Sequence, residues 1–129
     1  MKPHTAMVVD DDKDILTVVA KGLEQAGFAV HAYSDPIMAV QHVENGCNDC
    51  KVLVSDIRMP QMTGFQLIRR IKELRPEMKV IIMTAFELNM KEFGKVFSST
   101  PADGVIKKPF TPSKLAETIK EIYNNEKAA

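Results

Sequence analysis

The chain has 129 residues, with 17 basic and 17 acidic side chains, so its formal net charge at pH 7 is zero. This balance argues against a nucleic-acid-binding surface spread over the whole chain, because such domains are usually clearly basic. No run approaches 18 apolar residues, and the apolar stretch before residue 10 is too short for a signal-peptide core. We therefore expect one cytoplasmic domain over residues 1–129, with its core at about 5–125.

Short apolar runs rich in valine and isoleucine recur along the chain and predict β-strands. There are five such runs, at residues 5–10, 28–33, 51–56, 79–84 and 104–107. All are brief, as expected of strands that are buried on both faces of a sheet.

Amphipathic segments between these runs predict helices. They cover residues 13–26, 34–46, 64–75 and 112–123. Gly27 is a plausible C-terminal stop for the first helix, and Asp35 and Thr111 each precede a proline that suits a first helical position. The segment 86–103 is the least regular, and we expect a short or distorted helix there.

Five alternations of strand and helix predict an α/β fold, a doubly wound, five-stranded parallel sheet with helices on both faces. In open sheets of this kind, ligands bind beyond the carboxyl ends of the strands, where the strand order reverses. The residues that end each strand are therefore the first candidates for a functional site.

Charged and polar side chains end four of the five predicted strands. They are Asp10, Asp11 and Asp12 after the first strand, Asp56 at the end of the third, Thr84 at the end of the fourth, and Lys107 and Lys108 at the end of the fifth. With strand order 2-1-3-4-5, the first and third strands are neighbours, so Asp10, Asp11 and Asp56 converge. Clustered carboxylates suit a hard cation such as Mg²⁺, and Asp56 is the candidate nucleophile for a phosphoryl group.

Four segments resemble the motifs of response-regulator receiver domains of two-component signalling. They are "VVDDDKDIL", "LVSDIRMPQMTG", "IIMTAF" and "IKKPFTPSKL", and they occur in the family's order, each after the appropriate strand. The resemblance covers essentially the whole chain and implies a flavodoxin-like fold.

The resemblance implies a Mg²⁺ site beside the phosphoacceptor. In the family's pattern Asp11 is the direct metal ligand and Asp10 its acidic neighbour, while Asp56 and the backbone carbonyl of Arg58 complete the protein's share of the ligands.

The resemblance also implies the roles of the phosphoryl-binding residues. Asp56 matches the phosphoaccepting aspartate, Thr84 the hydroxyl that bonds a phosphoryl oxygen, and Lys108 the lysine that pairs with the phosphoryl group, with Lys108–Pro109 a candidate cis bond. The donor is a phosphohistidine of a histidine kinase or histidine phosphotransfer protein. The domain is then not an enzyme in the usual sense but a phosphoacceptor that assists its own phosphorylation and dephosphorylation. It relays the signal through its fourth helix, fifth strand and fifth helix to an unidentified effector. The resemblance also allows dimerisation on phosphorylation.

Two positions, Val105 and Thr63, depart from the family's pattern. Val105 stands where an aromatic switch residue is usual, so the relay uses another group, such as Phe86 or Phe97, or switching is weak. Thr63 replaces a common aspartate but can still cap a helix. The bulky side chains of Phe86 and Arg58 are hypothesised to shield the acyl phosphate from water, since they follow Thr84 and Asp56 by two positions.

Three other functions remain open at this point. An aspartyl-phosphate hydrolase of the haloacid dehalogenase type would use Asp10 and Asp12 as its D-x-D pair, but its later acidic metal motif is missing. A flavodoxin-like cofactor module would need phosphate-binding donors where the three aspartates stand. A pseudo-receiver would keep the fold as an interaction module without phosphorylation-dependent output.

Some features also have purely structural interpretations. Three consecutive aspartates can simply cap a helix N-terminus, and Asp12 is expected to do so. Cys47 and Cys50 have C-x-x-C spacing, but no second pair completes a zinc site in the sequence, so we interpret them as incidental loop cysteines. His4, His31 and His42 are scattered and are interpreted as structural or solvent-facing.

Overall fold

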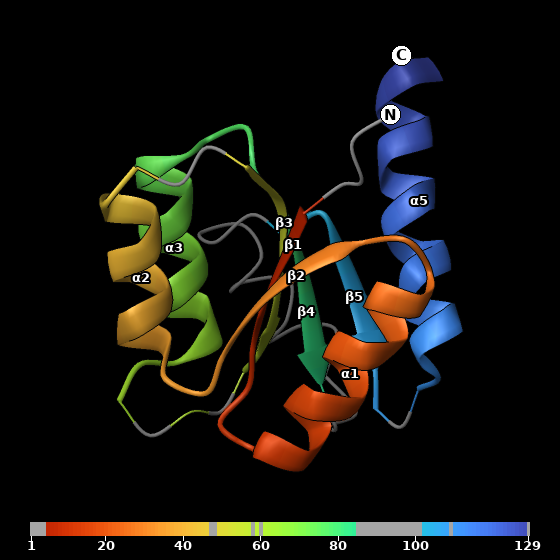
Figure 1. Cartoon of the computed structure of the whole chain (residues 1–129). Coiled ribbons are helices and arrows are strands. Elements are labelled where there is room, and N and C mark those ends of the chain that lie inside the picture. Colours follow the sequence, from red (N-terminus) through yellow and green to blue (C-terminus); the bar gives the residue numbers. More distant parts are fainter. Residues whose placement is uncertain are drawn as a thin grey trace, which may run out of the picture.

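A computed structural model describes residues 5–46, 49–57, 59, 61–84, 102–108 and 110–128, with side chains described as far as residue 122. Five parallel strands form one sheet in the order β2-β1-β3-β4-β5, which confirms the predicted topology (Figure 1). The strands are β1 (Thr5–Val9), β2 (Ala29–Tyr33), β3 (Cys50–Asp56), β4 (Lys79–Thr84) and β5 (Gly104–Lys107). The order reverses direction between β1 and β3, which places the expected ligand site at the carboxyl ends of these two strands.

Four helices in the described part of the chain cover the two faces of the sheet. They are α1 (Lys13–Gln25), α2 (Pro36–Glu44), α3 (Gly64–Leu74) and α5 (Pro112–Ala128). Figure 1 shows α1 and α5 on one face, and α2 and α3 on the other. The short helix expected at 86–103 falls almost wholly outside the described residues.

Alternating side chains of the central strands divide the core into two apolar clusters. Along β1, Ala6 and Val8 pack toward α1 and α5, whereas Met7 and Val9 pack toward α2 and α3. This follows from strand geometry, because successive side chains point to opposite faces. Both clusters are completed by helix positions at the predicted spacing, Val19 and Leu23 in α1 among them.

The expectation that every strand is buried on both faces was wrong for the two outer strands. Ala29 and Ala32 of β2 are exposed, as are Val105 and Lys107 of β5. The reason is position: β2 and β5 form the edges of the sheet, and the helices do not fully cover them. The central strands β1, β3 and β4 are almost wholly buried, as predicted.

Side-chain caps fix where the helices begin. The carboxylate of Asp12 accepts hydrogen bonds from the backbone of Asp14 and Ile15, which confirms its predicted capping role. Thr63 and Gln66 form a reciprocal capping box at the start of α3, so threonine does replace the usual aspartate as a cap. These caps matter for function because α1 and α3 are the next helices after β1 and β3, whose carboxyl ends carry the predicted site.

Candidate functional site

Asp10 lies at the carboxyl end of β1 and is completely buried. Its Oδ1 atom accepts a hydrogen bond from the Asp12 backbone (2.9 Å), and its Oδ2 atom accepts one from Lys108 Nζ (3.0 Å). The backbone N–H of Asp10 donates to the carbonyl of Tyr33 on β2 (3.2 Å). A buried carboxylate requires such partners, so the position and orientation of Asp10 are tightly specified.

Asp56 ends β3 and faces the same point from the neighbouring strand. Its Oδ1 atom accepts a hydrogen bond from the Ile57 backbone (2.9 Å) and lies 3.5 Å from Lys108 Nζ. Its side chain is 17% exposed, so an incoming group can reach it. Burial and the nearby charge of Asp10 raise the pKa of Asp56 above its usual range, although Lys108 and the Ile57 N–H oppose the rise. A more basic carboxylate is a better nucleophile.

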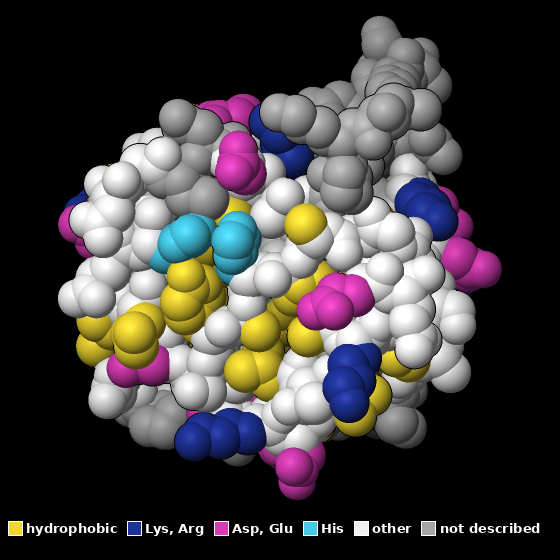
Figure 2. Space-filling view, in the orientation of Figure 1, with side chains coloured by type: hydrophobic (Ala, Val, Ile, Leu, Met, Phe, Trp, Pro, Cys, Tyr) yellow, Lys and Arg dark blue, Asp and Glu magenta, His cyan; other side chains and the backbone are white. Residues whose placement is uncertain are grey.

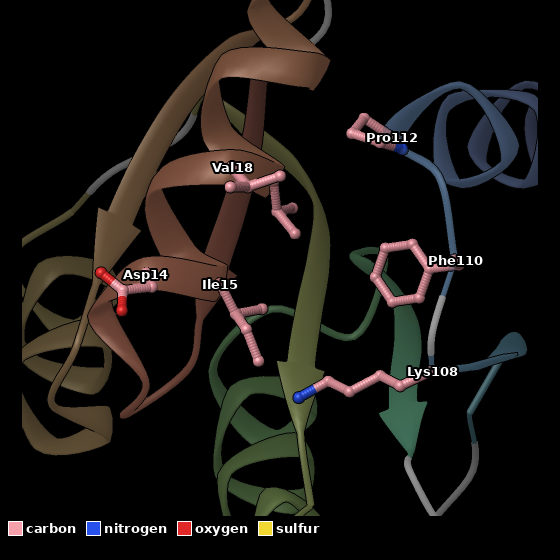
Figure 3. Close-up of a pocket in the computed structure, with 7 residues that line it drawn as sticks. Asp14, Ile15, Val18, Lys108, Phe110 and Pro112 are labelled. Carbon is pink, nitrogen blue, oxygen red and sulfur yellow. The ribbon is translucent and has the colours of Figure 1, made fainter.

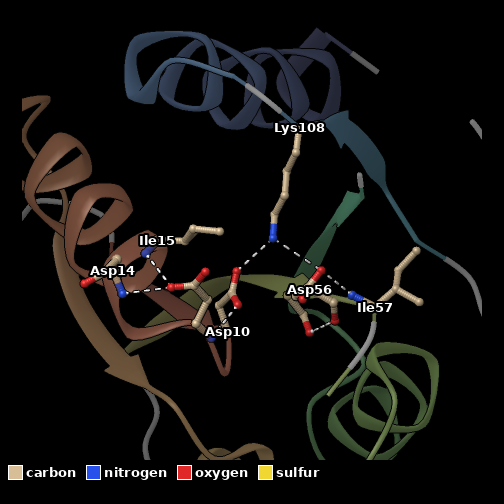
Figure 4. A network of polar contacts seen from close by, with 8 residues as sticks. Asp10, Asp14, Ile15, Asp56, Ile57 and Lys108 are labelled. Carbon is tan, nitrogen blue, oxygen red and sulfur yellow. Dashed lines mark hydrogen bonds and ion pairs between the residues drawn. The ribbon is translucent and has the colours of Figure 1, made fainter. Parts of the chain in front are cut away.

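Lys108, which follows β5, extends its ammonium group between the two carboxylates, as Figure 4 shows. Burial alone would lower the pKa of Lys108, but its hydrogen bond to Asp10 and the charges of Asp10 and Asp56 outweigh burial and raise it. The backbone N–H of Lys108 also donates to the carbonyl of Thr84 (2.6 Å). This bond fixes the backbone position from which the Lys108 side chain extends toward the carboxylates.

Asp10, Asp11 and Asp56 form a cluster of oxygen ligands. One carboxylate oxygen from each lies within 4.8 Å of the other two, and the burial of the three decreases from Asp10 through Asp56 to the exposed Asp11. Oxygen-only ligands with an open, solvent-facing side suit a small hard cation such as Mg²⁺, which keeps several water ligands. The described residues therefore fit the metal that the sequence predicts.

The remaining predicted site residues are Thr84, which the structure describes, and Arg58, which it does not. Thr84 is buried at the end of β4, and its strand pairs with both β3 and β5, so it lies between the strands that carry Asp56 and Lys108. Arg58 and the Lys108–Pro109 bond lie outside the described residues, as do Phe86 and Phe97. Their predicted roles stay predictions.

Gly64 is a site residue that sequence reasoning did not single out. Its N–H donates to the carbonyl of Ile57 (2.7 Å), and this closes the loop after Asp56. A Cβ atom at Gly64 would lie 2.2 Å from the Asp56 carbonyl oxygen, which is far inside contact distance. The signal was present in the sequence as a glycine at the first position of a helix, just after a capping threonine.

An apolar groove of about 530 Å³ begins at Lys108 and runs between α1 and the segment leading into α5. Figure 3 shows Ile15 and Val18 of α1 across from Phe110 and Pro112. Val18 is 58% exposed. An apolar surface beside a charged site is suited to contact with a protein partner.

Among the described residues, no helix is long and apolar enough to span a membrane.

Comparison with known proteins agrees with this geometry. The chain is 31% identical over 114 residues to the regulatory protein VanRc of Enterococcus gallinarum, covering 88% of this chain and 47% of that protein. It is 25% identical over 122 residues to the sensor kinase CckA of Brucella abortus, covering 95% of this chain and 13% of the kinase. The chain spans about half or less of these relatives' lengths.

Solved structures show the same similarity. A CheY-like receiver domain protein from Methanospirillum hungatei has 30% identity and a TM-score of 0.85, covering 98% of this chain and 99% of that one. A receiver domain protein from Clostridium thermocellum has 27% identity and a TM-score of 0.83, covering 96% and 97%. The family model of the response regulator receiver domain matches residues 6–120. The chain therefore belongs to the response regulator receiver domain family.

Proposed function

We propose that this chain is a Mg²⁺-dependent phosphoacceptor whose acceptor is Asp56. The observation that carries the proposal is the position of one ammonium group, on Lys108, between the buried Asp10 and the partly accessible Asp56. The exposed carboxylate of Asp11 completes an oxygen cluster at the same point. Membership of the receiver family supports phosphorylation as the use of this arrangement.

In the proposed reaction, a carboxylate oxygen of Asp56 attacks the phosphorus of a phosphohistidine. The new O–P bond forms as the N–P bond breaks, and the leaving imidazole takes up a proton. Transfer of this kind depends mainly on alignment and charge neutralisation. When bound by Asp10, Asp11, Asp56 and the carbonyl of Arg58, Mg²⁺ supplies positive charge to the phosphoryl oxygens.

The protein's own groups supply the remaining charge and alignment. The Lys108 ammonium is proposed to pair with a phosphoryl oxygen on Asp56, and its distance of 3.5 Å from that carboxylate supports this role. The Thr84 hydroxyl is proposed as a second donor. The Ile57 N–H fixes one Asp56 oxygen at 2.9 Å and so leaves the other for the attack.

The donor is proposed to be a histidine kinase or histidine phosphotransfer protein that docks in the groove beside Lys108. Val18 and Phe110 line this groove, which lies next to the acceptor and therefore suits a protein that must bring its phosphohistidine to Asp56.

Residues 1–129 are also proposed to form one cytoplasmic signalling domain. We also propose that it makes no direct contact with nucleic acid, since 17 basic and 17 acidic side chains leave no net positive charge.

Output is proposed to pass through the fourth helix, β5 and α5. A phosphoryl group would draw Lys108 away from Asp10, and the backbone bond from Lys108 to Thr84 joins that movement to both β4 and β5. Val105 of β5 is 38% exposed and has no ring to turn inward, so the change in shape is proposed to travel through the strands themselves. Such a change is a shift between two populated states.

The alternative of a pseudo-receiver is not favoured, because Asp10, Asp11, Asp56, Thr84 and Lys108 are all present. The deciding experiment is intact-mass spectrometry after incubation with acetyl phosphate, with and without Mg²⁺. We expect wild type to gain one phosphoryl group only with Mg²⁺, and Asp56→Asn to gain none. A folded wild type that gains nothing would support the pseudo-receiver instead.

A further inference from the structure

A second cluster of metal-ligating side chains lies at the opposite end of the sheet from the carboxylates. One ligand atom each from His31, His42 and Cys50 lies within 4.8 Å of the other two. Cys50 is the first residue of β3 and Asp56 the last, so these two positions are about 20 Å apart along the strand, and His31, in register with Met7, lies about halfway between them in that direction. The histidine–cysteine cluster is therefore separate from the proposed phosphoacceptor site.

Three elements bring these side chains together on the α2/α3 face of the sheet. His31 on β2 pairs in register with Met7, whose side chain belongs to the core on that face. Cys50 belongs to the same core. His42 is carried over them by α2, and its ring centroid lies 4.7 Å from that of His31. The two histidine side chains lie next to each other at the surface in Figure 2.

The state of the side chains is unusual for a purely structural cluster. The Nε2 atom of His42 is buried and has no hydrogen-bond partner among the described residues. A buried polar nitrogen without a partner costs free energy unless something binds it. Cys50 is completely buried and is present as a thiol.

We propose that His31, His42 and Cys50 bind a soft or borderline transition-metal cation, of which Zn²⁺ is the member to test. Two imidazole nitrogens and a thiolate suit Zn²⁺ and not the hard cations Mg²⁺ or Ca²⁺. Binding releases the thiol proton of Cys50 to solvent. It joins α2 to β2 and β3, so the metal acts as a clamp on one layer of the fold.

The observed spacing needs only a small adjustment. Two ligands of a tetrahedral Zn²⁺ are about 3.4–3.7 Å apart, given the usual Zn–N and Zn–S bond lengths. The three ligand atoms lie within 4.8 Å of one another, so each pair has to close by at most about 1.4 Å. Rotation of the partly exposed His31 and His42 side chains can supply a movement of this size, while the buried Cys50 stays in place.

The test uses the whole chain, kept reduced by a phosphine and saturated with Mg²⁺ so that the carboxylate cluster is occupied. Co²⁺ binding at the thiol can be seen directly, because coordination of Co²⁺ by a thiolate gives a charge-transfer absorption band, whereas coordination by carboxylates gives none. Zn²⁺ affinity follows from displacement of Co²⁺. We expect one Co²⁺ per chain with this band, its displacement by Zn²⁺, and a higher Tm with Zn²⁺.

Four variants decide whether the cluster is the site. His31→Gln, His42→Gln and Cys50→Ala should each weaken Zn²⁺ binding at least about tenfold, since loss of even a second-shell partner costs that much. Cys50→Ala should also abolish the charge-transfer band, whereas the control Cys47→Ser should keep it. Circular dichroism in EDTA shows whether each variant is folded.

Three results would overturn the proposal. One is a wild type that shows no charge-transfer band and no rise in Tm with Zn²⁺. Another is a band that survives in folded Cys50→Ala and disappears in Cys47→Ser, since the metal would then be held by the other thiol alone. Binding that is unchanged in both folded histidine variants would count equally against the site.

Discussion

Lys108 Nζ donates a hydrogen bond to Asp10 Oδ2 across 3.0 Å, and this carboxylate is completely buried. Loss of the ammonium would leave a buried negative charge without its ion-pair partner. Breaking a fully buried pair costs about 3–5 kcal/mol, and the 16% exposure of the Lys108 side chain reduces that cost. We expect Lys108→Gln to lower the free energy of unfolding by about 2–3 kcal/mol at pH 7 without metal.

The control is Lys107→Gln, because Lys107 is the exposed last residue of β5, directly before Lys108, and its loss should change stability by less than about 0.5 kcal/mol. The contribution of Lys108 also has a defined pH window. Its pKa is raised in the fold, so its stabilisation is present below the unfolded value of 10.5 and is lost as pH rises through the folded pKa. Equal urea midpoints for the two variants would contradict this account.

Asp56→Asn is expected to stabilise the metal-free protein at neutral pH. The raised pKa of Asp56 means that the fold favours its neutral form, so ionisation above the unfolded value of 3.8 destabilises the native state. The variant should therefore have a higher Tm than wild type at pH 7. The difference should disappear below about pH 3.8, where Asp56 of wild type is neutral in both the folded and the unfolded state. Thermal unfolding in EDTA at several pH values measures this.

Asp49→Asn is the matched control for that experiment, because Asp49 is an exposed carboxylate away from the site. It should leave the Tm nearly unchanged at pH 7. An Asp56→Asn variant that is less stable than wild type at pH 7 would contradict the electrostatic account of the site. It would mean that attraction by Lys108 favours the Asp56 carboxylate more than burial and repulsion by Asp10 disfavour it.

Mg²⁺ is expected to stabilise wild type and to have little effect on Asp11→Asn. At a hundredfold excess over Kd, binding to the native state alone adds about 2.7 kcal/mol. Asp12→Asn is a close control, since Asp12 caps α1 and asparagine caps equally well. It should keep the full Mg²⁺ effect. If Asp12→Asn lost the Mg²⁺ effect and Asp11→Asn retained it, the ligand assignment would be reversed.

Gly64→Ala is expected to impair phosphoryl acceptance, because its Cβ would force the Asp56 carbonyl and the following loop to move. Thr63→Ala removes the adjacent cap without adding an atom near Asp56, and should cost about 1 kcal/mol of stability while acceptance is unchanged. Rates of phosphorylation by acetyl phosphate compare the two. Equal rates in folded Gly64→Ala and wild type would show that the close approach is not required.

Val18→Asp is expected to slow phosphotransfer from a protein donor at least about tenfold by placing a charge in the apolar groove, a cost of about 1.4 kcal/mol or more. Acceptance from acetyl phosphate should not change, since the carboxylates are untouched. Thr17→Asp, on the same helix and outside the groove, is the control. A donor that transfers equally well to both variants must dock elsewhere.

The sequence was most informative where buried apolar runs end in polar residues. The strands at 79–84 and 104–107 were predicted to the residue, and convergence of Asp10, Asp11 and Asp56 followed from parallel strands ending at one edge. Helix α5 continues to residue 128 rather than 123, since a polar helix end carries no apolar periodicity to mark it.

What the sequence did not predict depends on side-chain geometry between distant segments. The closer contact of Lys108 with Asp10 than with Asp56 is one such feature. The approach of Gly64 to the Asp56 carbonyl is another, and the grouping of His31 with His42 and Cys50 is a third. These three histidine and cysteine residues are scattered in the sequence and meet through the register of β2, β1 and β3 together with the packing of α2 on that face.

The most direct test of the central claim is to locate the phosphoryl group. The protein would be incubated with acetyl phosphate and Mg²⁺, and the acyl phosphate reduced with borohydride, which converts the modified aspartate to homoserine. Peptide mass spectrometry then identifies the position. The account predicts homoserine at position 56 alone, whereas homoserine at position 10, or at neither position in the folded protein, would contradict it.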